Sequence, residues 1–124
     1  MNMTVTFDSS AWIEYFAGTG IGIKVKEFLE NNELIYTPSI CLLEIKNKYL
    51  RENKKWKKRI DFITDRSIII DLDSEISLLG ADIKNKHSLY SIDAIIYSSA
   101  QKHKSQLLTL DKHFQELQAV IMLE

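Results

Sequence analysis

The sequence is poor in proline, glycine and cysteine. One proline and four glycines among 124 residues argue against an all-β fold, because such folds join many short strands through turns rich in these two residues. The one cysteine, Cys41, excludes a disulfide within the chain. A chain without an internal disulfide suits the reducing cytoplasm, which is where we expect the protein to be located. The apolar context of Cys41, SICLLEI, is typical of a buried small hydrophobic residue; the alternative is a reactive thiol.

Long apolar stretches and a strong net charge are also missing from the sequence. No window approaches the 18 apolar residues of a membrane-spanning helix, and the N-terminus does not read as a signal peptide. The formal net charge is -1, so the charge of the whole chain does not indicate a nucleic-acid partner. Apolar residues make up 45% of the chain and charged residues 27%, which is enough for a core and a soluble surface. We therefore expect one domain over residues 1–124 and no membrane contact.

Strand and helix patterns alternate along the chain. Strands are expected at 4–7, 33–37, 67–72, 106–110 and 119–123. Helices are expected at 9–16, 23–32, 38–51, a basic helix that follows to about 65, 74–86, 91–104 and 111–117. Strands separated by helices predict a parallel sheet that helices cover on both faces, which is the α/β class.

Several boundaries in this pattern depend on particular residues. The segment GTGIG, 18–22, is expected to be a turn. Pro38 is expected at the first helical position, after Thr37 as the N-cap. Ser91 is expected to cap the helix that follows it. The continuous apolar run SIIIDL, 67–72, is typical of a strand buried on both faces.

Four acidic residues lie in apolar surroundings that are unfavourable for a lone carboxylate. Asp8 and Asp111 each end a predicted strand, whereas Glu44 and Asp93 lie early in predicted helices. Because the carboxyl ends of parallel strands meet at one edge of a sheet, we expect these four side chains to converge there. Taken singly, each could instead be structural, for example as a helix cap or a first-turn acid.

Converging carboxylates without matching cations predict a metal centre, since Mg²⁺ and Mn²⁺ prefer oxygen ligands. Two such ions about 4 Å apart would stabilise the attacking and the leaving oxygens of an in-line phosphoryl displacement, and one ion could generate hydroxide. The predicted chemistry is therefore hydrolysis of a phosphodiester without a covalent enzyme intermediate.

Four short motifs occur in order along the chain: FDSSAWIEYF, YTPSICLLEIKNKY, YSIDAIIYSSA and LLTLDKHF. With them the sequence resembles PIN-domain ribonucleases of the VapC toxin type over nearly its whole length. The resemblance implies a three-layer α/β/α fold with about five parallel strands, and RNA cleavage that depends on Mg²⁺ or Mn²⁺. It also implies a homodimer and a cognate antitoxin protein that covers the site.

The same resemblance assigns roles to individual residues. It implies that the metal ligands are Asp8, Glu44, Asp93 and Asp111. It also implies that Ser9 and Thr109, beside the first and last acids, bind the carboxylates or a metal-bound water. One position departs from the pattern, because many relatives have an acid where this chain has His113. We expect His113 to be a surface residue; the alternative is a metal ligand or a proton relay.

Half of the sixteen basic residues lie in one segment, KNKYLRENKKWKKR, which has one acid. The predicted RNA-binding residues in it are Lys46, Lys48, Arg51, Lys54, Lys55, Lys57, Lys58 and Arg59. Tyr49 and Trp56 lie between them, so the segment offers charge for phosphates and aromatic faces for bases. The alternatives are a solvated helix face and, for Trp56, a core or dimer-interface position.

Other motifs are weaker. DLDSE at 71–75 resembles the phosphatase motif of haloacid dehalogenases but has Glu75 where a threonine or valine is needed, so we expect Asp73 and Ser74 to cap a helix. The receiver domain of response regulators needs adjacent acids where Asp8 is followed by serines. His87 and His103 have no ligand-spaced partners for zinc, and GTGIG lacks the lysine of a phosphate loop.

The remaining alternatives to a toxin are a non-catalytic RNA-binding module and a PIN nuclease for RNA maturation.

Overall fold

The computed structural model describes residues 4–124 and has the predicted order of strands and helices. Its elements are β1 (Thr4–Phe7), α1 (Ser9–Ala17), α2 (Gly20–Asn31), β2 (Ile35–Pro38), α3 (Ser39–Arg51), α4 (Lys57–Arg66), β3 (Ile68–Ile70), α5 (Ser74–His87), α6 (Ser91–Lys102), β4 (Ser105–Thr109), the 3-10 helix η1 (Lys112–Phe114) and β5 (Val120–Met122). In the part of the chain so described, no helix has both the length and the apolar character to cross a membrane.

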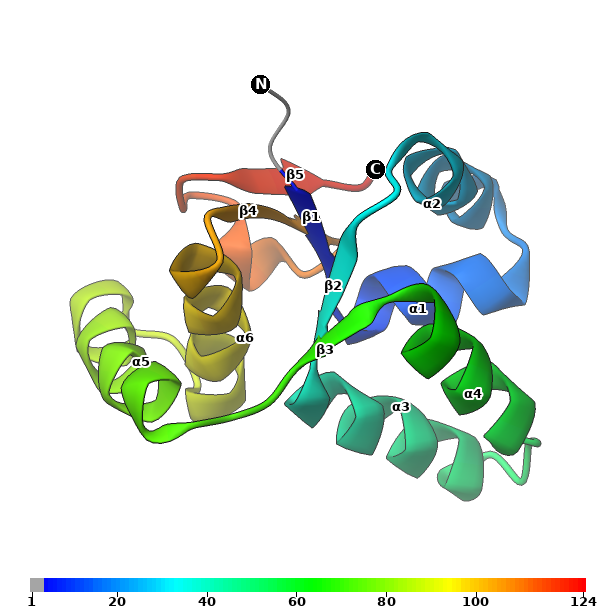
Figure 1. Cartoon of the computed structure of the whole chain (residues 1–124), viewed down its shortest axis with the longest axis horizontal. Helices are drawn as coiled ribbons and strands as arrows, with labels where there is room; N and C mark the ends of the chain where they lie inside the picture. Colours follow the sequence, from blue (N-terminus) through cyan, green and yellow to red (C-terminus); the bar gives the residue numbers. More distant parts are fainter. Residues whose placement is uncertain (1–3) are drawn as a thin grey trace.

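The five strands form one parallel sheet in the order β3-β2-β1-β4-β5. Helices α1 to α4 lie on one side of the sheet and α5 and α6 on the other, which gives the three-layer α/β/α arrangement expected (Figure 1). The strand order reverses direction between β1 and β4, which are neighbours in the sheet although they lie far apart in the sequence. Ligands of such sheets bind beside the carboxyl ends of strands at this kind of switch point.

The central strands pack into the core on both faces. Leu107 and Leu108 are consecutive in β4 and both are fully buried, as expected for a strand covered by helices on each side. On the α1 side, Trp12 is fully buried and its indole Nε1–H donates a hydrogen bond to Thr37 Oγ1 at 3.0 Å. The predicted burial of Cys41 is confirmed. These contacts fix α1 and the first residues of α3 against the carboxyl ends of β1 and β2.

The predicted turn at 18–22 is too long. Gly18 ends α1 in the left-handed conformation, with φ 68°, and Thr19 caps α2 by accepting a hydrogen bond from the Gly22 backbone N–H. Helix α2 therefore begins at Gly20. Gly22 packs so closely on α1 that a Cβ there would lie 2.2 Å from the carbonyl oxygen of Glu14. The third glycine permits close helix packing rather than a turn.

Two other helix starts also differ from prediction. Pro38 ends β2, where it pairs with Ile70, and α3 begins one residue later at Ser39. Thr37 does not cap α3, because its buried hydroxyl contacts Trp12 and Ser67 instead. Ser91 is the first residue of α6 rather than its cap, and no side chain caps this helix.

The third strand is shorter and more exposed than the run SIIIDL suggested. Strand β3 lies at the edge of the sheet, and Ile68 is 50% exposed, so the prediction of a strand buried on both faces is wrong. The prediction for Asp73 is confirmed, since it caps α5 by accepting a hydrogen bond from the Ile76 backbone N–H at 2.8 Å. Ser74, also predicted as a cap, is instead the first residue of α5. Asp73 also forms a salt bridge with Lys102.

Candidate metal centre

The four acids singled out in the sequence line one cavity of about 410 Å³. Asp8 follows β1 and Asp111 follows β4, while Glu44 and Asp93 come from α3 and α6. The predicted convergence of these side chains at the carboxyl edge of the sheet is therefore confirmed. Apolar side chains complete the walls: Ile13, Leu43, Ile92, Ile96 and Phe114.

Asp8 is the most buried of the four acids, with 4% of its surface exposed. Its Oδ1 accepts hydrogen bonds from the Ala11 backbone N–H at 2.9 Å and from Ser10 Oγ at 2.6 Å, and its Oδ2 accepts one from Thr109 Oγ1. Burial raises the pKa of Asp8 to about 6, these hydrogen bonds oppose the rise, and the charge of Asp111 adds to it. A nearby cation would favour its ionised form.

Glu44 and Asp93 show the same electrostatic pattern. Ser9 Oγ donates a hydrogen bond to Glu44 Oε1 at 2.5 Å. Burial raises the pKa of Glu44, and repulsion from Asp93 and Asp111 adds to the rise. Burial also raises the pKa of Asp93, as does Asp111, against a lowering by its hydrogen bond to His113. The cavity thus holds carboxylates that a divalent cation would neutralise.

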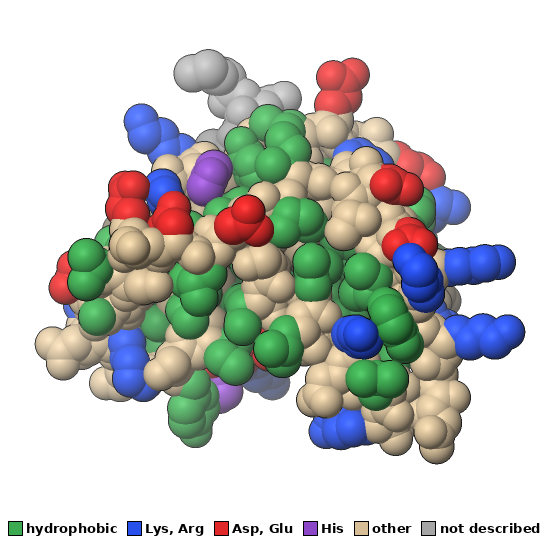
Figure 2. Space-filling view, turned by 60° about the horizontal axis from the view of Figure 1, so that its bottom comes forward, with side chains coloured by type: hydrophobic (Ala, Val, Ile, Leu, Met, Phe, Trp, Pro, Cys, Tyr) green, Lys and Arg blue, Asp and Glu red, His purple; other side chains and the backbone are tan. Residues whose placement is uncertain are grey.

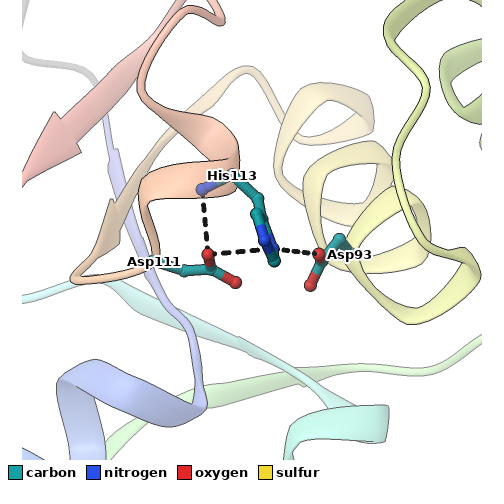
Figure 3. Close-up of side chains that lie close together, drawn as sticks. All are labelled: Asp93, Asp111 and His113. Carbon is teal, nitrogen blue, oxygen red and sulfur yellow. Dashed lines mark hydrogen bonds and ion pairs between the residues drawn. The ribbon is translucent and has the colours of Figure 1, made fainter.

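His113 lies against two of these acids, as Figure 3 shows. Its Nδ1 is 3.2 Å from Asp93 Oδ2 and 3.1 Å from Asp111 Oδ1. The side chain is 55% exposed, so it is at the surface as expected, but the two contacts to acids were not expected. Asp93, Asp111 and His113 each offer one ligand atom, and these three atoms lie within 4.8 Å of one another.

The two hydroxyl residues predicted beside the acids do contact carboxylates, Ser9 on Glu44 and Thr109 on Asp8. Sequence reasoning missed Ser10, which donates to Asp8 and accepts a hydrogen bond from the Leu110 backbone N–H at 3.0 Å. Ser10 thereby ties the end of β4 to the start of α1. Nothing in the local sequence separates its role from that of the adjacent serine.

Three residues of α3 that line the cavity were not assigned to it: Asn47, Lys48 and Arg51. They follow Glu44 by three, four and seven residues, which is the spacing of one helix face, so helical periodicity could have found them. Lys46, two residues after Glu44, instead lies over the ring of Trp56, with its Nζ 3.9 Å from the ring centroid.

The remaining basic residues of the segment lie away from the acids. A second hollow, of about 780 Å³, surrounds the turn between α3 and α4; its lining includes Leu50, Lys54, Lys55, Trp56, Lys57, Lys58 and Arg59. Lys and Arg side chains gather at the right of Figure 2, on the side where Figure 1 places α3 and α4. Trp56 is partly buried and packs against the core, and it also lines this hollow, so it is both a core contact and a surface residue.

Some of this positive charge is paired. Glu52 forms salt bridges with Lys48 at 2.6 Å and with Lys54 at 3.2 Å, and Asp61 forms one with Lys57 at 3.1 Å. Arg59 packs over the ring of Tyr49 at 4.4 Å. Both interleaved aromatic rings therefore contact basic side chains. Tyr49 is only 4% exposed, so the expectation that its ring is free for bases is wrong. Ion pairs on exposed helix faces contribute little to stability.

Comparison with known proteins gives a consistent result. The family profile described as "PIN domain" matches residues 5–120. No match was found among curated proteins. A toxin-antitoxin complex from Klebsiella pneumoniae is 22% identical, with a TM-score of 0.81, over 95% of this chain and 96% of the other.

Two further solved structures share the fold. VapBC2 from Rickettsia felis, bound to a DNA fragment from its promoter, is 18% identical with a TM-score of 0.75 over 97% of both chains. VapC20 from Mycobacterium tuberculosis, described as a sarcin-ricin loop cleaving toxin, is 12% identical with a TM-score of 0.76 over 97% of this chain and 99% of the other.

Proposed function

The chain belongs to the PIN domain family, and from this membership we propose that it is an endoribonuclease that uses Mg²⁺ or Mn²⁺ to hydrolyse RNA phosphodiester bonds. The observation that carries the proposal is the convergence of Asp8, Glu44, Asp93 and Asp111 in one cavity. Burial and mutual repulsion raise the pKa values of three of these acids, an arrangement that a bound cation relieves.

Each group of the cavity has a task in this reaction. A divalent ion held by the four carboxylates would supply charge stabilisation of the phosphoryl transition state and activation of a water. Ser9 orients Glu44, and Ser10 with Thr109 orients Asp8, so the ligands are held before the substrate arrives. Lys48 and Arg51 line the same cavity and place positive charge where a scissile phosphate would enter.

We extend the proposal to a toxin with a cognate antitoxin. Support comes from the likeness, over almost the full length of both chains, to a chain of a structure described as a toxin-antitoxin complex and to a chain of the VapBC2 structure. The antitoxin would cover the cavity and place a basic side chain among its carboxylates, where the charge is complementary. We also propose a homodimer in the cytoplasm, as expected from the sequence.

Loss of one ligand tests the catalytic proposal. A mixed-sequence single-stranded RNA is incubated with wild type, Asp93→Asn and Asp82→Asn, with Mg²⁺ or Mn²⁺ or with EDTA. Asp82 is an exposed acid of α5 that does not line the cavity, so Asp82→Asn removes one negative charge as Asp93→Asn does, but at a different place. We expect cleavage by wild type and Asp82→Asn with metal alone, and only the EDTA background for Asp93→Asn, because the cavity then lacks a ligand.

Each other outcome of this assay has a distinct meaning. Equal cleavage by Asp93→Asn would refute the role of the cavity and point to a contaminating nuclease. RNA binding without cleavage, unaffected by EDTA or by Asp93→Asn, would favour the non-catalytic RNA-binding module. Cleavage confined to one structured RNA precursor would favour RNA maturation over a toxin.

The basic surface should make RNA binding depend on salt. For the double variant Lys55→Gln/Lys58→Gln, we expect weaker binding at low salt and a slope of log K against log salt that is smaller by about 1.4, since each phosphate contact contributes about 0.7 for a single strand. The matched control, Lys86→Gln/Lys104→Gln, removes two exposed charges outside this surface. Fluorescence anisotropy with EDTA measures binding alone, and equal slopes for all three proteins would contradict the assignment.

A further inference from the structure

The ring of His113 is aimed between two carboxylates of the cavity (Figure 3). One nitrogen, Nδ1, makes both contacts, at 3.2 Å from Asp93 Oδ2 and 3.1 Å from Asp111 Oδ1. The two acids come from α6 and from the end of β4, so the imidazole joins separate elements. Both carboxylate oxygens therefore face the same imidazole nitrogen.

The spacing of these three atoms also fits the ligand shell of one ion. With metal–ligand bonds of about 2.1 Å, neighbouring ligands of an octahedral ion are about 3 Å apart and opposite ligands about 4.2 Å apart. The two contacts of Nδ1, at 3.1 and 3.2 Å, match neighbouring positions. One ligand atom from each of the three residues lies within 4.8 Å of the other two. An ion could therefore replace these contacts when the three side chains close around it.

The surroundings hold the imidazole in this orientation. The His113 backbone N–H donates a hydrogen bond to Asp111 Oδ1 at 2.9 Å, which couples the position of the histidine to that of the acid. The ring of Tyr90 packs edge-on against the imidazole, with centroids 5.4 Å apart. A ligand that is oriented before the ion arrives loses less conformational freedom on binding.

We propose that His113 Nδ1 is a ligand of the metal centre and that it makes the centre favour Mn²⁺ over Mg²⁺. The proposal rests on the proposed function, because it concerns the same ion. Mg²⁺ strongly prefers oxygen ligands and retains water, whereas an imidazole nitrogen binds first-row transition ions well. On binding, Nδ1 donates its lone pair to the ion while Nε2 carries the hydrogen. An imidazolium releases its Nδ1 proton to solvent, and a neutral ring with its hydrogen on Nδ1 exchanges it through solvent for one on Nε2.

Metal binding without RNA tests the proposal directly. Calorimetric titration gives the Mn²⁺ and Mg²⁺ affinities of wild type, His113→Asn, His113→Asp and the control His87→Asn, an exposed histidine at the end of α5. We expect His113→Asn to weaken Mn²⁺ binding by at least about tenfold, since even indirect supports of a ligand are worth about 10–100-fold, with little change for Mg²⁺. We expect His113→Asp, which supplies an oxygen, to favour Mg²⁺ relative to wild type.

Pulsed electron paramagnetic resonance of bound Mn²⁺ identifies the ligand independently of affinity. We expect modulation from a coordinated ¹⁴N in wild type and His87→Asn, and its loss in His113→Asn and His113→Asp. Bound Mn²⁺ without nitrogen modulation in wild type, or equal losses of Mn²⁺ and Mg²⁺ affinity in His113→Asn, would overturn the inference and leave the nuclease proposal intact. A wild type that binds neither ion and cleaves no RNA would overturn both.

Discussion

Asp8→Asn should make the metal-free protein more stable at neutral pH and abolish its RNA cleavage. The Asp8 carboxyl is 4% exposed, and burial raises its pKa from 3.8 to about 6. Between these two values the folded protein keeps a proton that the unfolded chain has lost, so the free energy of unfolding falls as the pH rises. Above pH 6 the loss is complete and amounts to about 3 kcal/mol for a shift of about two pKa units.

Asparagine preserves the local structure that Asp8 supports. Its Oδ1 can accept the hydrogen bonds that Asp8 Oδ1 takes from the Ala11 backbone N–H and from Ser10. Because asparagine carries no charge at any pH, the variant should lose less stability than wild type between pH 5 and 7. At pH 7 its free energy of unfolding should be about 2–3 kcal/mol higher than that of wild type. Because the pKa values of Glu44 and Asp93 are also raised, the free energy of unfolding of Asp8→Asn should still fall with rising pH, but less steeply than that of wild type.

Urea unfolding in EDTA at pH 5, 6 and 7 measures this effect. Asp82→Asn is again the control, because it removes an exposed charge and should follow wild type. Cleavage assays with metal on the same samples should show that Asp8→Asn is stable and inactive. A wild type whose stability is equal at pH 5 and 7, or an Asp8→Asn variant that is less stable at pH 7, would contradict the assigned burial energy.

The order of elements could be predicted because it depends on local patterns of apolar residues and caps. The place of a strand in the sheet could not, because strand order depends on crossovers between distant segments. The run SIIIDL shows the difference: its apolar residues predict a strand, but β3 lies at an edge and exposes Ile68. Pro38 shows it too, since a first helical position and a strand end are both compatible with proline, and pairing with Ile70 decides between them.

The acids of the site could be predicted because a carboxylate between apolar residues is a local anomaly. Ser10 could not, since its role requires the start of α1 to meet the backbone of Leu110, a hundred residues later in the chain. The contacts of His113 likewise depend on the approach of α6 to the end of β4. The sequence places Lys46 among basic neighbours, but a residue two positions after Glu44 lies on another face of α3, where Lys46 contacts Trp56.

Protons and a metal ion are alternative ways to neutralise the same cavity, so metal should stabilise the protein strongly at pH 7 and weakly at pH 5. At a free Mn²⁺ concentration of 100 times Kd, binding adds about 2.7 kcal/mol. For a chain of 124 residues this corresponds to a rise in Tm of about 10 °C. At pH 5 the raised pKa of Asp8, about 6, keeps that ligand protonated, and Mn²⁺ must displace the proton.

Thermal unfolding with Mn²⁺ or EDTA at both pH values measures the shift, and Asp82→Asn should behave as wild type. Asp93→Asn should lose most of the shift at pH 7, because it removes a ligand while leaving the buried Asp8 in place. A rise in Tm that is the same at pH 5 and 7, or that persists in Asp93→Asn, would mean that Mn²⁺ binds outside the cavity. The dependence on Asp93 places the ion in the cavity, and the dependence on pH excludes a site made of exposed acids alone, since those are already ionised at pH 5.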